Sequence, residues 1–264
     1  MQWENIVYSE FKQAAEKSQG VCVILVGCIE PHGKHLPLGT DFLTAHKIAL
    51  MAAEKEPAVV FPPMYFGCIY EAKAMPGTIA LKPDLLFSLY ENVFSEIARN
   101  GFDKILIYNG HGGNNHFLGF LIVSRLAEKR NYTLYVKNGA GFTKEQQKDV
   151  DNDMQGRAGG HACEWETSNA LYLFEDLVKM ENLLDGYFPY NERRFDVGKN
   201  CGNEIDWYSC CPDYYVGDAH HSTKELGKKY VTYSVDNLIK TIKCIKTDSL
   251  RSELLQEYYD KSNM

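Results

Sequence analysis

The stretch VCVILV at residues 21–26, followed by GCIEPHGKHLPLGTD at residues 27–41, decides the fold of this chain. Its six consecutive apolar residues, bounded by Gly20 and Gly27, predict a buried strand. The apolar residues between Asp41 and Ala53 have helical spacing, so a strand, a loop and a helix follow one another. The loop carries four side chains that can bind metals, Glu30, His32, His35 and Asp41.

The same alternation continues along the chain. Further strands are expected at residues 58–61, 104–108 and 133–137, and further helices at 83–100, 116–130 and 168–178. Strands that alternate with helices of this length form right-handed βαβ units around a mostly parallel sheet that is covered on both faces. We therefore predict the α/β fold class and a single domain over residues 1–264. Residues 180–215 are rich in Asn, Asp, Tyr and Gly and predict a long loop region near the site.

Composition excludes several classes of partner. The formal net charge of −7 argues against a phosphate backbone or an anionic membrane as the principal partner. No apolar run approaches the roughly 18 residues of a membrane span, and the polar N-terminal segment does not resemble a secretion signal. The eight cysteines lack CxxC spacing, which suits reduced thiols. We expect a cytoplasmic protein that acts on a small molecule, without nucleic acid or membrane partners.

A second polar cluster, NGHGGNNH at residues 109–116, directly follows the strand predicted at 104–108. Ligands of open parallel sheets bind beyond the carboxyl ends of the strands, so the two clusters should meet. Glu30 and His32 are two residues apart and leave an extended chain on the same side, while Asp41 can fold back over them. His111 would make a fourth ligand. Carboxylates mixed with imidazoles suit Zn, Mn or Fe better than Ca or Mg.

A third cluster, GGHACEWETS at residues 159–168, offers Glu164 or Glu166 as a further partner of the metals, and Thr167 or Ser168 could cap the following helix. His35 is expected to orient a ligand or to touch substrate. The NGHGGN segment lacks the Lys-Ser/Thr ending of a phosphate-binding loop, so its glycines are interpreted as letting the backbone approach metals and substrate.

Five motifs in the same order resemble the creatininase (creatinine amidohydrolase) family: GCIEPHGKHLPLGTD, MPGTIAL, NGHGGNN, GGHACEWETS and GDAHHSTKELGKKY. The resemblance implies a three-layer α/β/α fold, a dinuclear metal site, hydrolysis of a C–N bond in a small amide, and assembly as hexamers. Glu30, His32 and Asp41 match the first ligand motif of the family, in which the Asp bridges both metals. His111 matches the ligand of the Asn-Gly-His motif, and His161 and Glu166 match the His and Glu of the His-Ala-Gly-x-x-Glu-Thr-Ser motif.

The chain departs from the family pattern at three positions. Creatininase proper has a metal-binding Glu where this chain has Gly113, so Glu166 is assigned as the last ligand. Pro31 replaces the Gln of many members, and Ala72 lies where many relatives carry a His. Other family branches deformylate a formylamino-pyrimidine nucleotide or trim a peptide-derived cofactor precursor. We therefore expect a small polar cyclic or formyl amide as substrate and do not favour creatinine.

The predicted chemistry follows from these residues. Two divalent ions (Zn, Mn or Fe) bridged by Asp41 would lower the pKa of a shared water from about 15.7 toward about 7, giving a hydroxide that attacks the amide carbonyl. His161 is the predicted general acid for the leaving nitrogen. Three residues of the Gly-rich loop are expected to hold a planar polar substrate together with His35: Asn109, Gly112 and Asn114.

Two other functions compete with this one. A metal-binding regulatory or binding protein of the same fold without turnover is compatible with the three departures, but Glu30 and Asp41 are both retained. A Rossmann-type enzyme that handles phosphates would need a glycine fingerprint after the first strand, which GCIEPHG does not supply.

Overall fold

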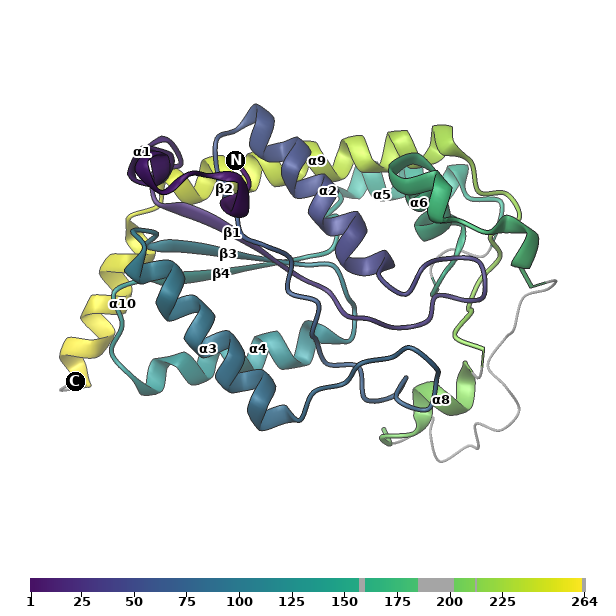
Figure 1. Cartoon of the computed structure of the whole chain (residues 1–264), viewed down its shortest axis with the longest axis horizontal. Coiled ribbons are helices and arrows are strands. Elements are labelled where there is room, and N and C mark those ends of the chain that lie inside the picture. Colours follow the sequence, from purple (N-terminus) through teal and green to yellow (C-terminus); the bar gives the residue numbers. More distant parts are fainter. Residues whose placement is uncertain (157–159, 185–201, 212, 263–264) are drawn as a thin grey trace.

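Four parallel strands form the centre of the protein (Figure 1). The structure is a computed structural model that describes residues 1–156, 160–184, 202–211 and 213–262. The strands are β1 (Val21–Val26), β2 (Val59–Val60), β3 (Lys104–Asn109) and β4 (Thr133–Asn138). They lie in the order β2-β1-β3-β4, and each neighbouring pair is parallel. The predicted parallel sheet is therefore confirmed.

Helices cover both faces of the sheet. One face packs against α2 (Thr40–Lys55) and α9 (Lys224–Thr247), and the other against α3 (Pro83–Arg99) and α4 (Asn114–Ser124). Successive side chains of a strand point to opposite faces, and all six side chains of β1 are buried because both faces are covered. This arrangement confirms the three-layer α/β/α fold.

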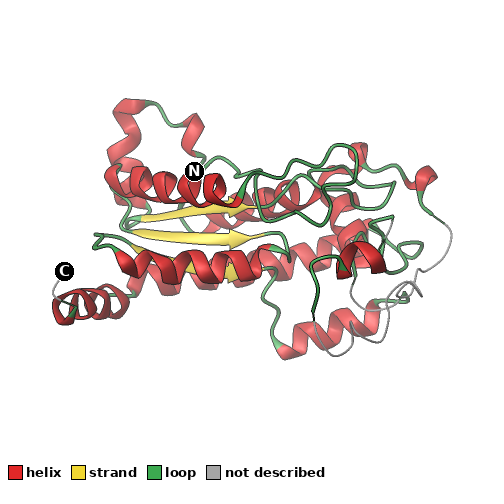
Figure 2. Cartoon of the chain, turned by 90° about the horizontal axis from the view of Figure 1, so that it is seen from below, coloured by secondary structure: helices red, strands yellow, loops and turns green. Residues whose placement is uncertain are grey.

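The remaining elements lie around these layers, as Figure 2 shows in a second view. The other α-helices are α1 (Phe11–Lys17), α5 (Lys144–Asp153), α6 (Glu164–Phe174), α8 (Asp206–Cys210) and α10 (Leu250–Lys261). Short 3₁₀ helices span Trp3–Asn5, Tyr8–Glu10, Arg125–Ala127, Glu175–Leu177 and Met180–Asn182. Within the described ranges, none of the helices combines the length and the apolar character that crossing a bilayer requires.

Two predicted helices have different bounds in the structure. The helix expected at 116–130 begins at Asn114 and ends at Ser124, because the chain passes through a 3₁₀ turn and reaches an extended residue, Glu128, before β4. The helix expected from residue 168 begins at Glu164, so the prediction that Thr167 or Ser168 caps it is wrong. Both hydroxyls take part in contacts with distant residues instead.

The prediction for residues 180–215 falls partly outside the described residues, which leave out 185–201 and 212. Its described parts contain the 3₁₀ turn Met180–Asn182 and helix α8. The long helix α9 was not predicted from the sequence.

Candidate metal centre

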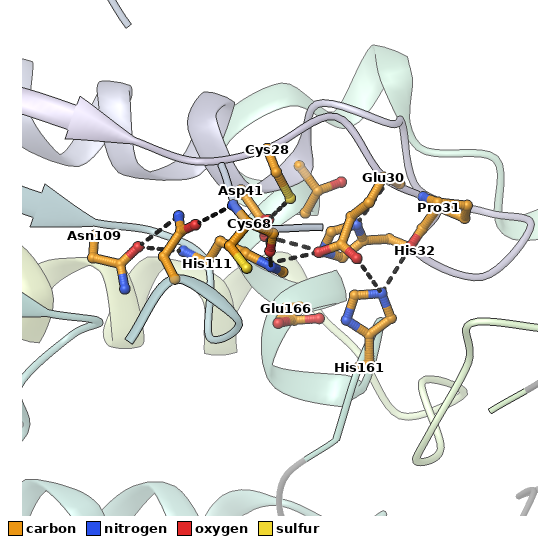
Figure 3. Close-up of polar contacts among 12 residues, drawn as sticks. Cys28, Glu30, Pro31, His32, Asp41, Cys68, Asn109, His111, His161 and Glu166 are labelled. Atoms are coloured by element: carbon orange, nitrogen blue, oxygen red, sulfur yellow. Dashed lines mark hydrogen bonds and ion pairs between the residues drawn. The ribbon is translucent and has the colours of Figure 1, made fainter. Parts of the chain in front are cut away.

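The site lies at the carboxyl edge of the sheet, where the loops after β1 and β3 meet (Figure 3). Val26 and Asn109 are register partners at the ends of these strands, so both loops leave the sheet at the same place. Glu30 and His32 come from the first loop, Asp41 from the first turn of α2, and His111 from the second loop. The predicted meeting of the two clusters is confirmed, as expected for a parallel sheet.

Asp41 contacts two imidazoles through its two oxygens. Its Oδ1 atom lies 3.0 Å from Nε2 of His32, and its Oδ2 atom lies 3.0 Å from Nδ1 of His111. The same nitrogen of His111 lies 2.8 Å from Oε1 of Glu30. These four residues are between 0% and 8% exposed, and ionisable groups are buried to this extent only when they are paired or bind an ion.

The donor atoms form two groups, within each of which all atoms lie within 4.8 Å of one another. One group contains Cys28, Glu30, Asp41 and His111, and the other contains Glu30, His32 and His161. Glu30 belongs to both. Cys28 was not identified from the sequence, although its place two residues before Glu30 in the same loop was a usable signal.

Close pairing shifts the pKa values of these groups. Burial by itself would lower the pKa of His32, but the carboxylates of Asp41 and Glu30 outweigh it and raise this pKa to about 10. Burial likewise opposes the ionised form of Asp41, yet the two imidazoles hold the pKa of this carboxyl well below its usual range. Without an ion, therefore, the charges of the site compensate one another.

The arrangement of these atoms fits a cation. Oε1 of Glu30 is buried and has an ion-pair contact with Nδ1 of His111 at 2.8 Å, but no hydrogen bond with a residue that the structure describes. Nε2 of His111 lies 3.2 Å from the carbonyl oxygen of Cys68, and a hydrogen bond donated there leaves Nδ1 free to bind an ion. Carboxylates with neutral imidazoles are the ligands of Zn, Mn and Fe.

His161 and Pro31 connect two segments that are far apart in the sequence. Nε2 of His161 lies 2.7 Å from the carbonyl oxygen of Pro31 and 3.9 Å from Oε2 of Glu30. The rings of His161 and His32 lie side by side, with centroids 4.2 Å apart. Nε2 can thus carry a proton at the edge of the site, and the predicted role of His161 as general acid stays a prediction.

The two acids of the third cluster have different partners. The Glu164 carboxylate is buried and accepts hydrogen bonds from the backbone N–H groups of Gln155 and Gly156. Glu166 accepts a hydrogen bond from the N–H of Ala162 at 2.5 Å, and Ala162 has the unusual φ of +57°. Glu164 therefore supports a loop. Glu166 belongs to neither group of donor atoms, and its role as the last ligand stays a prediction.

The residues predicted to hold substrate have mainly internal partners. The Asn109 amide accepts from the His111 N–H and donates to Asn115 and Asn138, while the Asn114 amide connects Asn109 with the backbone of Cys68. These contacts hold the His111 loop in place, and direct contact with a substrate stays a prediction for both amides.

His35 and Gly112 occupy different surroundings. The His35 ring is buried, its Nε2 atom lies 2.8 Å from Oγ1 of Thr167, and burial lowers its pKa to about 4, so it is neutral at physiological pH. This contact joins the first loop to α6. Gly112 is exposed at the turn before α4. Substrate binding by these two residues also stays a prediction.

A cavity of about 50 Å³ adjoins Asp41 and is lined by polar residues of α6 that sequence reasoning missed. Trp165 and Asn169 both line it, and the Trp165 Nε1 and Asn169 Oδ1 atoms are buried without a partner in the described part of the chain. A second cavity of about 450 Å³ shares Trp165 and Glu166 with the first. Unpaired polar atoms of residues that line a cavity beside Asp41 can recognise a polar ligand.

Two known proteins are similar to this chain in sequence. The chain is 28% identical to a creatinine amidohydrolase of Pseudomonas putida over 186 residues, 65% of this chain and 72% of that protein. It is 31% identical to a mycofactocin precursor peptide peptidase of Mycolicibacterium smegmatis over 170 residues, 62% of each.

Solved structures have the same fold. A creatininase structure described as a Mn form has a TM-score of 0.80 at 22% identity, covering 94% of this chain and 99% of that one. A creatininase variant of Zn-Zn type has a TM-score of 0.78 at 21% identity, covering 94% and 98%. The family model of creatinine amidohydrolases matches residues 4–242. With this match over nearly the whole length, the chain belongs to the creatininase family.

Proposed function

We propose that this member of the creatininase family is a metal-dependent amidohydrolase with two divalent ions, Zn, Mn or Fe, at the carboxyl edge of its sheet. The observation that carries the proposal is the pair of buried donor groups that share Glu30, with one oxygen of Asp41 beside each of His32 and His111. Asp41 would therefore hold the ions together with Glu30, His32 and His111. The Zn-Zn and Mn structures of relatives support the choice of metals.

Bound ions would supply Lewis-acid chemistry, lowering the pKa of a water toward about 7 and polarising an amide carbonyl. The side chains around them have separate tasks. Glu30, Asp41, His32 and His111 hold the ions. His161, with Nε2 beside Glu30 and the Pro31 carbonyl, gives its proton to the leaving nitrogen. The Glu166 carboxylate keeps the buried Ala162 in its unfavourable backbone conformation.

A small polar cyclic or formyl amide is the substrate that we favour. The cavity beside Asp41 is small, and the unpaired atoms of Trp165 and Asn169 offer one donor and one acceptor, the complement of an amide. A second candidate is a peptide amide, because the adjoining cavity of about 450 Å³ could take a longer chain and one relative is a peptide peptidase.

Elemental analysis and a substrate panel test the proposal together. The protein is reconstituted with Zn, Mn or Fe and assayed on creatinine, other lactams, formamides and short peptides for ring-opened product, formate and free amino groups. We expect about two ions per chain and turnover of one of these classes. Failure to bind any of the three metals would contradict the proposal. Two bound ions without turnover of any compound would favour the regulatory alternative.

A further inference from the structure

The Cys28 thiol lies inside the metal centre. It follows β1 by two residues and is fully buried, and its sulfur lies 3.1 Å from Oδ2 of Asp41, to which it donates a hydrogen bond. Its sulfur also belongs to the group of four donor atoms that includes Glu30, Asp41 and His111. Figure 3 shows the sulfur beside the Asp41 carboxylate.

We propose that Cys28 is itself a metal ligand, so that one ion is held by one sulfur, one nitrogen and carboxylate oxygens, and that this position prefers Zn²⁺ or Co²⁺ to Mn²⁺. The inference rests on the metal centre proposed above and is independent of substrate and turnover. Soft thiolate sulfur selects metals such as zinc, whereas Mn²⁺ prefers oxygen ligands.

The spacing of the four side chains suits this assignment. Around an ion with ordinary bond lengths, tetrahedral ligand atoms lie about 3.3 to 3.6 Å apart. The corresponding contacts here are 3.1 Å from Cys28 to Asp41, 3.0 Å from Asp41 to His111 and 2.8 Å from His111 to Glu30. These three pairs need to move apart by only a few tenths of an ångström to hold an ion, and all four donor atoms lie within 4.8 Å of one another.

The neighbouring position 113 cannot supply a ligand in place of Cys28. Gly113 has no side chain, and a Cβ atom there would lie 2.4 Å from Nε2 of His111. When the sulfur binds the ion, its electron pair forms the new bond, the S–H bond breaks, and the proton leaves to solvent without any change of oxidation state.

Cobalt loading of the whole protein tests the inference without an activity assay. We expect Co²⁺ to produce a near-ultraviolet sulfur-to-cobalt charge-transfer band that is absent in Cys28→Ser. Cys68→Ser is the matched control and should retain the band. The backbone oxygen of Cys68 contacts Nε2 of His111, and the Cys68 sulfur belongs to neither donor group. In competition, the preference of the protein for Zn²⁺ over Mn²⁺ should fall by roughly tenfold or more in Cys28→Ser.

X-ray absorption at the zinc edge gives a second measurement that needs no variant, and a sulfur neighbour at about 2.3 Å is expected. Zinc that binds with only nitrogen and oxygen neighbours would overturn the inference and leave the proposed function intact. A cobalt band that persists in Cys28→Ser would also overturn it. If the protein binds no metal at all, the proposed function fails together with this inference.

Discussion

Asp41 and His161 stand in different relations to the metal centre, and their replacement should have different effects. Asp41 places one oxygen beside each of two imidazoles, so Asp41→Ala should lower metal content and activity together. His161 donates toward a backbone carbonyl, so His161→Asn should leave the metal content nearly unchanged while kcat falls by roughly 10²–10⁴-fold, the usual contribution of a positioned acid.

Metal stoichiometry and steady-state rate, measured for both variants on the substrate found in the panel, separate the two roles. If His161→Asn loses as much metal as Asp41→Ala, His161 is a ligand. Its membership of the second donor group is compatible with that role. If His161→Asn keeps full activity, the leaving nitrogen receives its proton from another group.

At the scale of elements, the packing of α6 against α9 depends on a glycine. A Cβ atom at Gly227 would lie 1.9 Å from the backbone oxygen of Ser168, which cannot move away independently of its helix. Gly227→Ala should therefore destabilise the protein by about 1–3 kcal/mol, the usual cost of overpacking. Gly119 is the matched control on α4, because a Cβ there meets nothing within 4 Å, and Gly119→Ala should stabilise by about 0.5–1 kcal/mol.

Urea unfolding followed by circular dichroism measures both changes. Equal urea midpoints for Gly227→Ala and the unchanged protein would show that α6 and α9 can move apart without loss of stability. Since α6 also carries Trp165 and Asn169 at the cavity, a shift of α6 should weaken substrate binding in the same variant.

For the whole molecule, removal of the ions should lower thermal stability. Ions that bind only the folded chain stabilise it by about 2.7 kcal/mol when present at 100 times their dissociation constant. In a protein of this size each kcal/mol corresponds to about 2–4 °C in Tm. Differential scanning calorimetry should therefore show a fall of several degrees after chelation, which zinc restores and magnesium does not. An unchanged Tm on complete removal of metal would contradict the proposed centre.

The family resemblance predicts a hexamer. Phe120 and Val123 on α4 are 65% and 62% exposed, and contacts between copies would remove such apolar surface from water. Light scattering coupled to size exclusion should therefore give a mass six times that of the 30.0 kDa chain. A mass equal to that of one chain over the micromolar range would contradict this prediction.

The sequence by itself determined the layered parallel fold and the edge at which the site forms. Both depend on local patterns. The apolar run at 21–26 and the helical spacing after Asp41 define a strand and a helix, and parallel strands place their carboxyl ends together whatever the details of the loops. The convergence of Glu30, Asp41 and His111 followed from this rule.

Only the tertiary structure decided how the side chains of the site are used. Whether Glu164 faces the metals or a loop, and where α6 begins, depends on contacts with segments distant in the sequence, such as the hydrogen bond between Thr167 and His35. The sulfur of Cys28 became a candidate ligand only when its distance to Asp41 was known. Local patterns set the direction of the backbone, whereas the partner of each polar side chain is set by whatever the folded chain brings within hydrogen-bonding distance.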